Sequence, residues 1–554
     1  MSGNAAKKIP PQKQQSPSQD DSSSNAIETL SKRQSQELLI GLCGLIGAGM
    51  NSVRTCLEKE LIDLGYEIEH IHLSSLIKKY FYPDEPESKG YNRYKRYQEL
   101  GNEIRKTHGP QILAEAAISE IARIQKEAQI AEGKKNDKDW KFQKKVAYII
   151  DQVKNPSEVE LLRMVYQHNF YYIGVIRSET ERKRNLRDES IEKHEVDDLI
   201  HRDRESNGEI GQQTEKAILD ADFYIRNTQS HYASLSEKIK RFISLIHGVN
   251  GLTPSLNEKG MFYAYTSSLQ SACLSRQVGA AILDKDGNII ATGRNDVPKF
   301  KGGLYSYEDK DKDYRCIYKG AKCYNDVYKK QIKESIKDVI SKELNLESNK
   351  TKRYFSEETV NKLKQSSSTK ETNSSVCDLE LSEELVKRIS DSIYENSRLG
   401  SLIEFSRSIH AEMDAITSLA RISGANTKGK ILFTTTYPCH NCARHIVASG
   451  IESVIYIEPY EKSLALELHD DAIVDNVDDT TSKLAFTTFE GVAPRRYQKF
   501  FFSTSDRKKD GLAVAKCSKY DNHVDIQFLD SAQTFQVKIF ADFQQKISNS
   551  SLEN

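Results

Sequence analysis

Two short motifs in the C-terminal half carry the residue types of a catalytic metal site. They are His410-Ala411-Glu412 and Pro438-Cys439-His440-Asn441-Cys442. Imidazole and thiolate are ligands that zinc prefers, and a catalytic zinc site keeps its fourth position open for water. The carboxylate of Glu412 can then carry protons during a hydrolysis. The motifs therefore predict hydrolytic chemistry, with His410, Cys439 and Cys442 as zinc ligands and Glu412 as the catalytic residue.

The segments around these motifs predict strands and helices that bring the four side chains together. Residues 430–436 form an apolar run that predicts a buried strand leading into the cysteine pair, and residues 453–457 predict another strand. Residues 443–450 between them predict a helix that a glycine ends. The first-turn side chains of a helix converge ahead of its axis, so His410 and Glu412 can share one site. A helix N-terminus also lowers the pKa of a thiol, which favours zinc-binding thiolates.

A Cys-x-x-Cys pair has other uses that the motif alone does not exclude. Structural zinc sites and redox pairs use the same spacing. A structural site needs a fourth Cys or His ligand, and His440 and His445 are available. The order strand, metal loop, helix, strand favours the catalytic alternative, because it is a common layout for catalysis in an α/β sheet.

The overall composition limits the class of protein. The chain has 554 residues, too many for one core, and its formal net charge of zero gives no general attraction to nucleic acid. It contains no run of about 18 apolar residues, so no membrane span is expected, and it starts without an apolar signal core. The nine cysteines fit a reducing compartment better than a disulfide framework. The predicted location is therefore the cytoplasm.

Changes in composition divide the chain into segments. Residues 1–36 are polar and predict a disordered tail. Residues 37–247 alternate apolar runs with helical patterns, which is typical of βαβ units. A second α/β block covers residues 258–504, with a polar insertion at about 345–380 that predicts a loop. Residues 505–554 form a C-terminal extension, in which alternating apolar and polar positions between 511 and 540 predict short strands.

A glycine-rich segment follows the first predicted strand. Gly44-Leu45-Ile46-Gly47-Ala48-Gly49-Met50-Asn51-Ser52 lies between that strand and a predicted helix, which is the context of a phosphate-binding P-loop. Met50 stands at the position of the P-loop lysine and Asn51 at that of the magnesium-binding Ser or Thr, with Ser52 next to it. Loss of the lysine argues against phosphoryl transfer. Binding of ATP, GTP or another nucleotide stays open, and so does an ordinary tight turn.

Further residues fit a kinase-like frame. Asp151 ends the predicted strand 146–151, where a Walker-B acid would stand. Another strand is predicted at residues 170–176. The arginines that follow it predict either a basic lid or a solvated helix face, and they are Arg177, Arg182, Arg184 and Arg187. On these features the N-terminal half resembles P-loop nucleoside and deoxynucleoside monophosphate kinases.

The C-terminal half resembles the deoxycytidylate deaminases. The segments Ser271-Ala272-Cys273-Leu274-Ser275-Arg276-Gln277-Val278-Gly279-Ala280-Ala281-Ile282 and Ala291-Thr292-Gly293-Arg294-Asn295-Asp296-Val297-Pro298 carry the likeness, together with the zinc motifs, which are the signature of zinc-dependent nucleobase deaminases. The resemblance implies that Asn295 contacts the sugar of a nucleotide. It also implies that Arg276 lies near phosphate or at a subunit contact, and a surface ion pair is the alternative for Arg276.

The two halves together predict an α/β protein with a P-loop kinase-like parallel-sheet domain followed by a cytidine-deaminase-like α/β/α domain. This order resembles the bacterial anti-phage dCTP deaminases. The resemblance implies Zn²⁺ as cofactor, dCTP and dCMP as substrates, deoxyuridine nucleotides as products, a homo-oligomer, and an inhibitory small RNA as partner. A polynucleotide cytidine deaminase, a bifunctional kinase–deaminase of nucleotide salvage and a purely regulatory nucleotide sensor are the alternatives.

Overall fold

The described residues of the computed structural model fall into two compact units. One unit is formed by the chain up to residue 252 together with residues 503–554, and the other by residues 253–502. The structure describes residues 35–135, 137, 140, 142, 144–204, 213–228, 232–354, 383–397, 399, 402–422, 424–460, 462–475, 482–502, 506–514 and 529–553. Almost all of the predicted tail 1–36, and residues 355–380 of the predicted insertion, lie outside these ranges.

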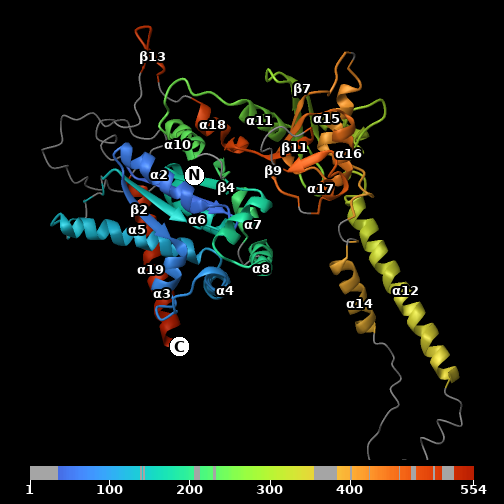
Figure 1. Cartoon of the computed structure of the whole chain (residues 1–554), viewed down its shortest axis with the longest axis horizontal. Helices are drawn as coiled ribbons and strands as arrows, with labels where there is room; N and C mark the ends of the chain where they lie inside the picture. Colours follow the sequence, from blue (N-terminus) through green and yellow to red (C-terminus); the bar gives the residue numbers. More distant parts are fainter. Residues whose placement is uncertain are drawn as a thin grey trace, which may run out of the picture. The chain divides into compact units, whose positions relative to one another are not determined.

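The first unit is built on a parallel sheet (Figure 1). Its strands lie in the order β5-β4-β1-β3-β2, and every adjacent pair among them is parallel. The bounds are Leu38–Gly44 for β1, Glu67–His72 for β2, Val146–Asp151 for β3, Phe170–Ile176 for β4 and Phe223–Arg226 for β5. The strands predicted at residues 146–151 and 170–176 are confirmed as β3 and β4. Because parallel strands end at one edge, the segments after β1 and β3 meet there.

Helices connect and cover these strands. Their bounds are α2 Met50–Asp63, α3 Leu73–Tyr80, α4 Gly90–His108, α5 Ile112–Ala131, α6 Pro156–Tyr166, α7 Glu179–Asp188, α8 Lys193–Arg204, α9 Thr214–Ile218 and α10 Tyr232–Ile246, with a 3₁₀ turn at Gln167–Asn169. The helix α2 starts inside the glycine-rich segment, directly after Gly49, which has a φ of 73°. Residues other than glycine rarely adopt that backbone conformation.

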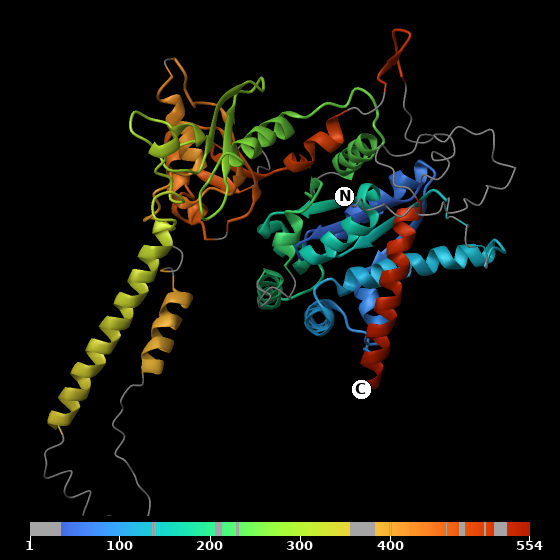
Figure 2. The ribbon, with the colours of Figure 1, turned by 180° about the vertical axis from the view of Figure 1, so that it is seen from behind.

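The C-terminal extension is a helix where the sequence predicted strands. The helix α19 spans Leu529–Glu553. Among the described residues of the extension, the strands before it are those of one short hairpin, in which β13 Lys508–Lys509 pairs with β14 Leu512–Ala513. Figures 1 and 2 show α19 beside α5 of the first unit. Lys546 of α19 forms an ion pair of 2.7 Å with Glu115 of α5. Its buried positions Gln536 and Phe543 are seven residues apart, a helical spacing that outweighs the local alternation.

The second unit contains a mixed sheet. Its strands lie in the order β10-β11-β9-β8-β6-β7, where β6 is antiparallel to β7 and β8 and the other pairs are parallel. The bounds are β6 Gly279–Leu283, β7 Ile289–Arg294, β8 Ile431–Thr436, β9 Ser453–Glu458, β10 Ile473–Asp475 and β11 Leu484–Thr488. The two-residue strand β12, Gly491–Val492, is not a strand of this sheet. The strands predicted at residues 430–436 and 453–457 are confirmed as β8 and β9.

Helices cover both faces of this sheet. They are α11 Leu256–Ser268, α15 Ala411–Leu419, α16 His440–Ala448, α17 Ala465–Leu468 and α18 Tyr497–Phe501, with 3₁₀ turns at Tyr307–Lys312 and Pro494–Arg496. Leu432 packs in one core with Ala411 and Cys442 from α15 and α16. The next residue, Phe433, faces α11, where a Cβ at Gly260 would lie 2.4 Å from its ring. Successive strand residues point to opposite faces, so the unit has the α/β/α layers that the sequence predicted.

A helical arm interrupts the second unit. The helices α12, Tyr324–Tyr354, and α14, Glu383–Asn396, lie side by side (Figures 1 and 2) and are joined by an ion pair of 2.7 Å between Lys333 and Asp391. The insertion was predicted to be a loop from residue 345, but α12 continues to Tyr354. In the part of the chain that the structure describes, no helix is both long and apolar enough to cross a lipid bilayer.

Candidate functional sites

The three predicted zinc ligands converge in the second unit. His410 Nδ1 lies 3.3 Å from Cys439 Sγ and 3.3 Å from Cys442 Sγ. Two ligands of a tetrahedral zinc, one nitrogen and one sulfur, would be about 3.6 Å apart given usual bond lengths. His410, Cys439 and Cys442 also form the one group of three or more potential metal ligands found among the described residues. The donor set and its spacing therefore fit a zinc ion with a fourth position left open.

The starts of two helices position these ligands. His410 and Cys439 are the residues that precede α15 and α16, and Cys442 lies in the first turn of α16. The backbone N–H of Cys442 donates to Cys439 Sγ at 3.5 Å. The neighbouring Cys442 thiol holds the pKa of Cys439 well below its ordinary value, and the His410 imidazole adds to this effect. Cys439 is thus prepared to bind a cation as a thiolate.

Close backbone packing fixes His410 against the sheet. A Cβ at Gly293 of β7 would lie 2.2 Å from the carbonyl oxygen of Ala411, so only glycine lets the start of α15 approach the strand this closely. The backbone N–H of Ile409 donates to the carbonyl oxygen of Asp296 at 3.0 Å. The sequence drew attention to Gly293 and Asp296 only as neighbours of Asn295, because such backbone contacts leave no signal in residue type.

Glu412 lies beside the cluster and is almost fully buried. Its side chain is in the first turn of α15, it is 4% exposed, and Cys442 Sγ donates to its Oε2 at 3.5 Å. Burial raises the pKa of its carboxyl above the ordinary value. A buried carboxyl next to a cation-binding cluster has the placement that a proton carrier requires.

The side chain of Asn295 is buried and hydrogen-bonded to the protein backbone at both ends of its amide. It is 7% exposed, its Oδ1 accepts from the Val278 N–H at 2.7 Å, and its Nδ2 donates to the Arg276 carbonyl oxygen at 2.8 Å. Both ends of the amide thus hold the segment between Arg276 and Val278. The role of Asn295 at the sugar stays a prediction, and its observed contacts position that segment.

Arg276 lies at the end of the sheet that carries the cysteine pair. Its Nη1 binds Glu458 Oε1 at 3.0 Å, and Thr436 donates to the other oxygen of Glu458 at 3.0 Å. The Arg276 side chain is 46% exposed. Tyr460 is half-buried nearby, where burial raises the pKa of its hydroxyl and both Cys439 and Arg276 act on it electrostatically. No motif in the sequence marked Tyr460.

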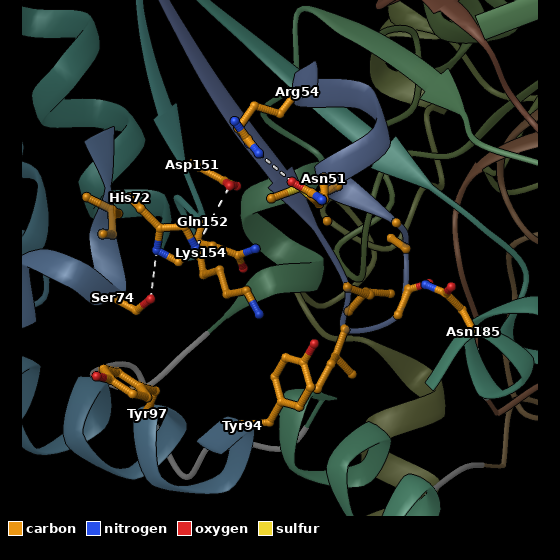
Figure 3. A pocket seen from close by; sticks show the side chains of 18 of the residues that line it. Asn51, Arg54, His72, Ser74, Tyr94, Tyr97, Asp151, Gln152, Lys154 and Asn185 are labelled. Carbon is orange, nitrogen blue, oxygen red and sulfur yellow. Dashed lines mark hydrogen bonds and ion pairs between the residues drawn. The ribbon is translucent and has the colours of Figure 1, made fainter. Parts of the chain in front are cut away.

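The first unit contains a large cavity in front of the glycine loop. Its volume is about 770 Å³, and the whole predicted loop from Gly44 to Ser52 lines it together with Asp151. Figure 3 shows Lys154 and Tyr94 reaching into this space, with Asn51 at its upper side. The cavity thus brings together every residue predicted for the P-loop site. Its size lies within the range of about 300–1,000 Å³ that small-molecule sites occupy.

Side chains from other elements hold the carbonyl groups of the glycine loop. Asn227 Nδ2 donates to the carbonyl oxygens of Ala48 and Gly49 at 3.0 and 2.9 Å, and Asn185 Nδ2 donates to that of Gly47 at 3.1 Å. Among the described residues, no hydrogen bond to the backbone N–H of Gly47 or Gly49 is formed. The loop therefore keeps donors for an anion while its acceptors are occupied.

Cationic side chains gather around the same cavity. Lys154 binds Asp203 Oδ1 at 3.0 Å, and Arg177 Nε donates to the carbonyl oxygen of Asn227 at 2.6 Å. Arg177 and Arg182 are buried, at 7% and 3% exposed, whereas Arg184 and Arg187 are exposed. The solvated-face alternative for the arginines is thus right only for the last two. Lys154 was missed, since a lysine three residues after a strand carries no motif.

Comparison with known proteins finds a family model that matches most of the second unit. Residues 254–458 match the cytidine and deoxycytidylate deaminase zinc-binding region. Residues 254–458 are therefore similar to a zinc-binding deaminase region, called the deaminase region below. The three residues of the zinc cluster and Glu412 fall inside it, as do Asn295 and Arg276. The glycine loop and its cavity lie outside it.

Curated relatives match a short part of this chain. The deoxycytidylate deaminases of the phages T2 and T4 are each 42% identical over 55 residues, which is 10% of this chain and 29% and 28% of theirs. ComE operon protein 2 of Bacillus subtilis is 42% identical over the same length, 29% of its own chain. The match thus spans less than a third of each relative.

Solved structures similar to parts of the chain include deaminases and a kinase. The dCMP deaminase of cyanophage S-TIM5 in apo form covers 43% of this chain and 100% of its own, at 17% identity and a TM-score of 0.20. Shikimate kinase of Acinetobacter baumannii in complex with shikimate covers 37% of this chain and 92% of its own, at 14% identity and a TM-score of 0.21.

Proposed function

We propose that this chain hydrolytically deaminates deoxycytidine nucleotides, dCTP and dCMP, to deoxyuridine nucleotides. The observation that carries the proposal is the convergence of His410, Cys439 and Cys442 beside the buried Glu412 inside the deaminase region. A structural zinc site has no need for that carboxyl, whereas a hydrolytic site requires a proton carrier.

The residues of the site have distinct roles in this reaction. His410, Cys439 and Cys442 would hold zinc, which when bound supplies the Lewis acidity that lets water attack near neutral pH. Glu412 accepts a proton from the attacking water and delivers it to ring N3 of cytosine. It then carries a second proton to the departing amino group. The overall reaction consumes one water and releases ammonia.

The preference for deoxynucleotides and the biological role are part of the same proposal. The relatives of phages T2 and T4 are deoxycytidylate deaminases, which supports a deoxycytidine nucleotide as substrate. Arg276, half-exposed at the end of the sheet that bears the cysteine pair, can face the phosphates. Deamination of dCTP removes a DNA precursor, and we propose that this depletion serves defence against phage, as in the enzymes that the sequence resembles.

We also propose that the first unit binds a nucleotide and regulates the deaminase without transferring phosphate. Met50 occupies the position of the P-loop lysine, and it is 6% exposed. A Cβ at Gly44 would lie 3.1 Å from Met50 Sδ, so the methionine packs against the strand end. The loop still offers backbone donors to an anion, but it lacks the mobile cation that phosphoryl transfer uses.

The substitution Glu412→Gln tests the deaminase proposal. It keeps the shape of the side chain but removes its proton-carrying carboxyl, so we expect deamination of dCTP and dCMP to fall about 10²–10⁴-fold. The zinc content should not change, because Glu412 is no ligand. The assay follows ammonia release and the formation of dUTP and dUMP, with dCDP, CTP and a single-stranded oligonucleotide as further substrates.

A matched control and two other outcomes complete this test. Glu452→Gln changes an exposed carboxylate of the same unit, which pairs with Lys285, and should leave the rate unchanged. Undiminished activity of Glu412→Gln would contradict the role of Glu412 as proton carrier. Faster deamination of the oligonucleotide than of dCTP would favour a polynucleotide deaminase, and ATP-dependent phosphorylation of a nucleoside monophosphate would favour a bifunctional enzyme.

A further inference from the structure

A buried glutamine without hydrogen bonds lines the P-loop cavity. Gln98 is 7% exposed, and neither its Oε1 nor its Nε2 has a hydrogen-bond partner among the described residues. A buried amide that makes no hydrogen bond destabilises a protein, because nothing replaces the water that its polar atoms lose on burial. Such an arrangement at a cavity wall is explained if a ligand completes the bonds.

A second unsatisfied donor lies on the same face of the same helix. Arg105 follows Gln98 by seven residues on α4, and its Nη1 is buried with no partner among the described residues. Positions seven apart point the same way on a helix. Gly101 lies between them on this face and also lines the cavity, as does Tyr94 one turn before Gln98. The glycine leaves room between the two polar side chains.

The guanidinium of Arg105 is held in place by another buried group. Its Nε and Nη2 donate to Glu158 Oε1 at 2.8 and 2.7 Å, and Glu158 is 0% exposed. The other oxygen of Glu158 accepts from the backbone N–H groups of Lys154 and Asn155 at the start of α6. With two nitrogens bound, the direction of the remaining Nη1 is fixed before any ligand arrives. This is the preorganisation that favours tight binding.

We propose that the cavity of the first unit is a pyrimidine nucleotide site in which Gln98 and Arg105 read the Watson–Crick edge of the base. This inference rests on the proposed function, in which the same cavity takes a nucleotide. The phosphates would lie on the glycine loop near Lys154 and Arg177, and the base would lie along α4 next to Tyr94. The deaminase region is a separate site in the other unit.

The set of donors and acceptors favours pyrimidines over purines. The glutamine amide supplies one acceptor and one donor to adjacent base atoms, and Arg105 supplies a further donor. Cytosine presents N4–H, N3 and O2, and uracil or thymine presents O4, N3–H and O2, so each satisfies all three groups once the amide is turned accordingly. Adenine has no acceptor for the Arg105 donor beside its N1 and N6. Guanine places its own N2–H donor there.

The charges around the cavity fit the phosphate end of this ligand. The cationic side chains that line it are those of Arg54, Arg93, Arg105, Lys154 and Arg177, and the carboxylates are those of Asp151 and Glu189. Arg54, Arg105 and Lys154 are paired with Glu58, Glu158 and Asp203. The cations that can meet a phosphate are therefore those of Arg93 and Arg177, together with the backbone N–H groups of Gly47 and Gly49. An anionic ligand is favoured at this end and a neutral base at the α4 end.

The test measures nucleotide binding by the full chain with and without Gln98. The probe is dTTP, which has no exocyclic amine and cannot be deaminated, compared with dATP, dGTP and tripolyphosphate. We expect dTTP to bind at least tenfold tighter than either purine nucleotide. Gln98→Leu should weaken dTTP binding at least tenfold and leave tripolyphosphate binding unchanged. Lys106→Ala, an exposed change on the same helix, is the control and should bind dTTP normally.

A stability measurement separates this role from a structural one. Leucine is close to glutamine in size and lacks its unsatisfied groups, so ligand-free Gln98→Leu should melt no lower than the unchanged chain. The rise in Tm on adding dTTP should disappear. Equal affinity for purine and pyrimidine nucleotides, or normal dTTP binding by Gln98→Leu, would overturn the recognition of the base by Gln98 and Arg105. Neither result would overturn the nucleotide site. Failure of both dTTP and tripolyphosphate to bind would overturn the nucleotide site itself, whatever the deaminase does.

Discussion

Individual side chains in this protein often serve to place other residues. The amide of Asn295 is occupied by the backbone of Arg276 and Val278, and the carbonyl of Asp296 holds the residue before His410. The residue types that supply zinc chemistry could be read from two motifs because their ligands must have fixed chemistry and spacing. The positioning contacts could not be read, since backbone atoms are the same in every residue.

A buried carboxyl of the first unit gives stability a defined dependence on pH. Glu37 accepts from Gln125 and Ser35, and burial raises its pKa from 4.5 to about 6. Below pH 4.5 the group is protonated in both the folded and the unfolded chain. As the pH rises through the raised pKa, the folded chain must release a proton that it holds more tightly, so stability falls by about 2 kcal/mol.

The substitution Glu37→Gln should remove this loss. We expect the free energy of unfolding of the variant, relative to the unchanged chain, to rise by about 2 kcal/mol between pH 4.5 and pH 7. Urea unfolding followed by the fluorescence of Trp140, the single tryptophan of the chain, reports on the first unit. Glu87→Gln, at an exposed position, should show a difference that does not vary with pH. The same constant difference for Glu37→Gln would mean that Glu37 titrates normally.

Among the secondary-structure elements, the predicted strands that are buried were confirmed, whereas those predicted from exposed residues were wrong. The strands at residues 146–151 and 170–176 were predicted with their correct bounds, because buried parallel strands are continuous apolar runs. The strands predicted between residues 511 and 540 were wrong where α19 stands. Phe535 and Val537 supplied the alternation, yet they are 46% and 71% exposed. Period-two apolar positions indicate a strand only if they lie on one buried face, and the sequence does not show which apolar residues are buried.

The anchoring of α19 depends on one aromatic side chain. Phe543 is 0% exposed and packs edge-on against Tyr80 at 5.4 Å and near Phe81 at 6.1 Å between ring centres. Phe543→Ala should reduce the free energy of unfolding of the first unit by about 3–5 kcal/mol, since it opens a cavity in this contact. The measurement is urea unfolding followed by Trp140.

The same helix provides the control for this change. Phe535 is 46% exposed, so Phe535→Ala should alter stability by no more than about 0.5 kcal/mol. If both variants unfolded at the same urea concentration as the unchanged chain, α19 would contribute no stability to the first unit.

The P-loop cavity shows a further reason why sequence was informative only in part. The glycine loop was recognisable because a phosphate cradle needs flexible backbone and a following helix. Gln98 and Arg105 were not, because nothing in a helix with mixed polar residues marks which ones face a cavity. Their significance comes from the tertiary structure, which buries them and supplies Glu158 to only one of the two.

For the molecule as a whole, two separate cores divide the chemistry. The glycine loop and its cavity belong to the unit that includes both ends of the described chain, and the zinc cluster belongs to residues 253–502. This organisation predicts that removal of zinc has a local effect. The three ligands join the starts of α15 and α16, so the free energy of zinc binding stabilises the second unit specifically.

We therefore expect one zinc per chain, and its extraction by a chelator should lower the melting temperature of the second unit and speed hydrogen exchange in α15 and α16. The Trp140 unfolding transition of the first unit should stay within error, because that unit supplies no zinc ligand. Cys442→Ser should lose the metal and mimic chelation. Cys323→Ser, a change at a thiol of the same unit outside the cluster, should keep one zinc. Retention of zinc by Cys442→Ser would contradict the ligand assignment, and a shift of the Trp140 transition as large as that of the second unit would contradict the separation of the two cores.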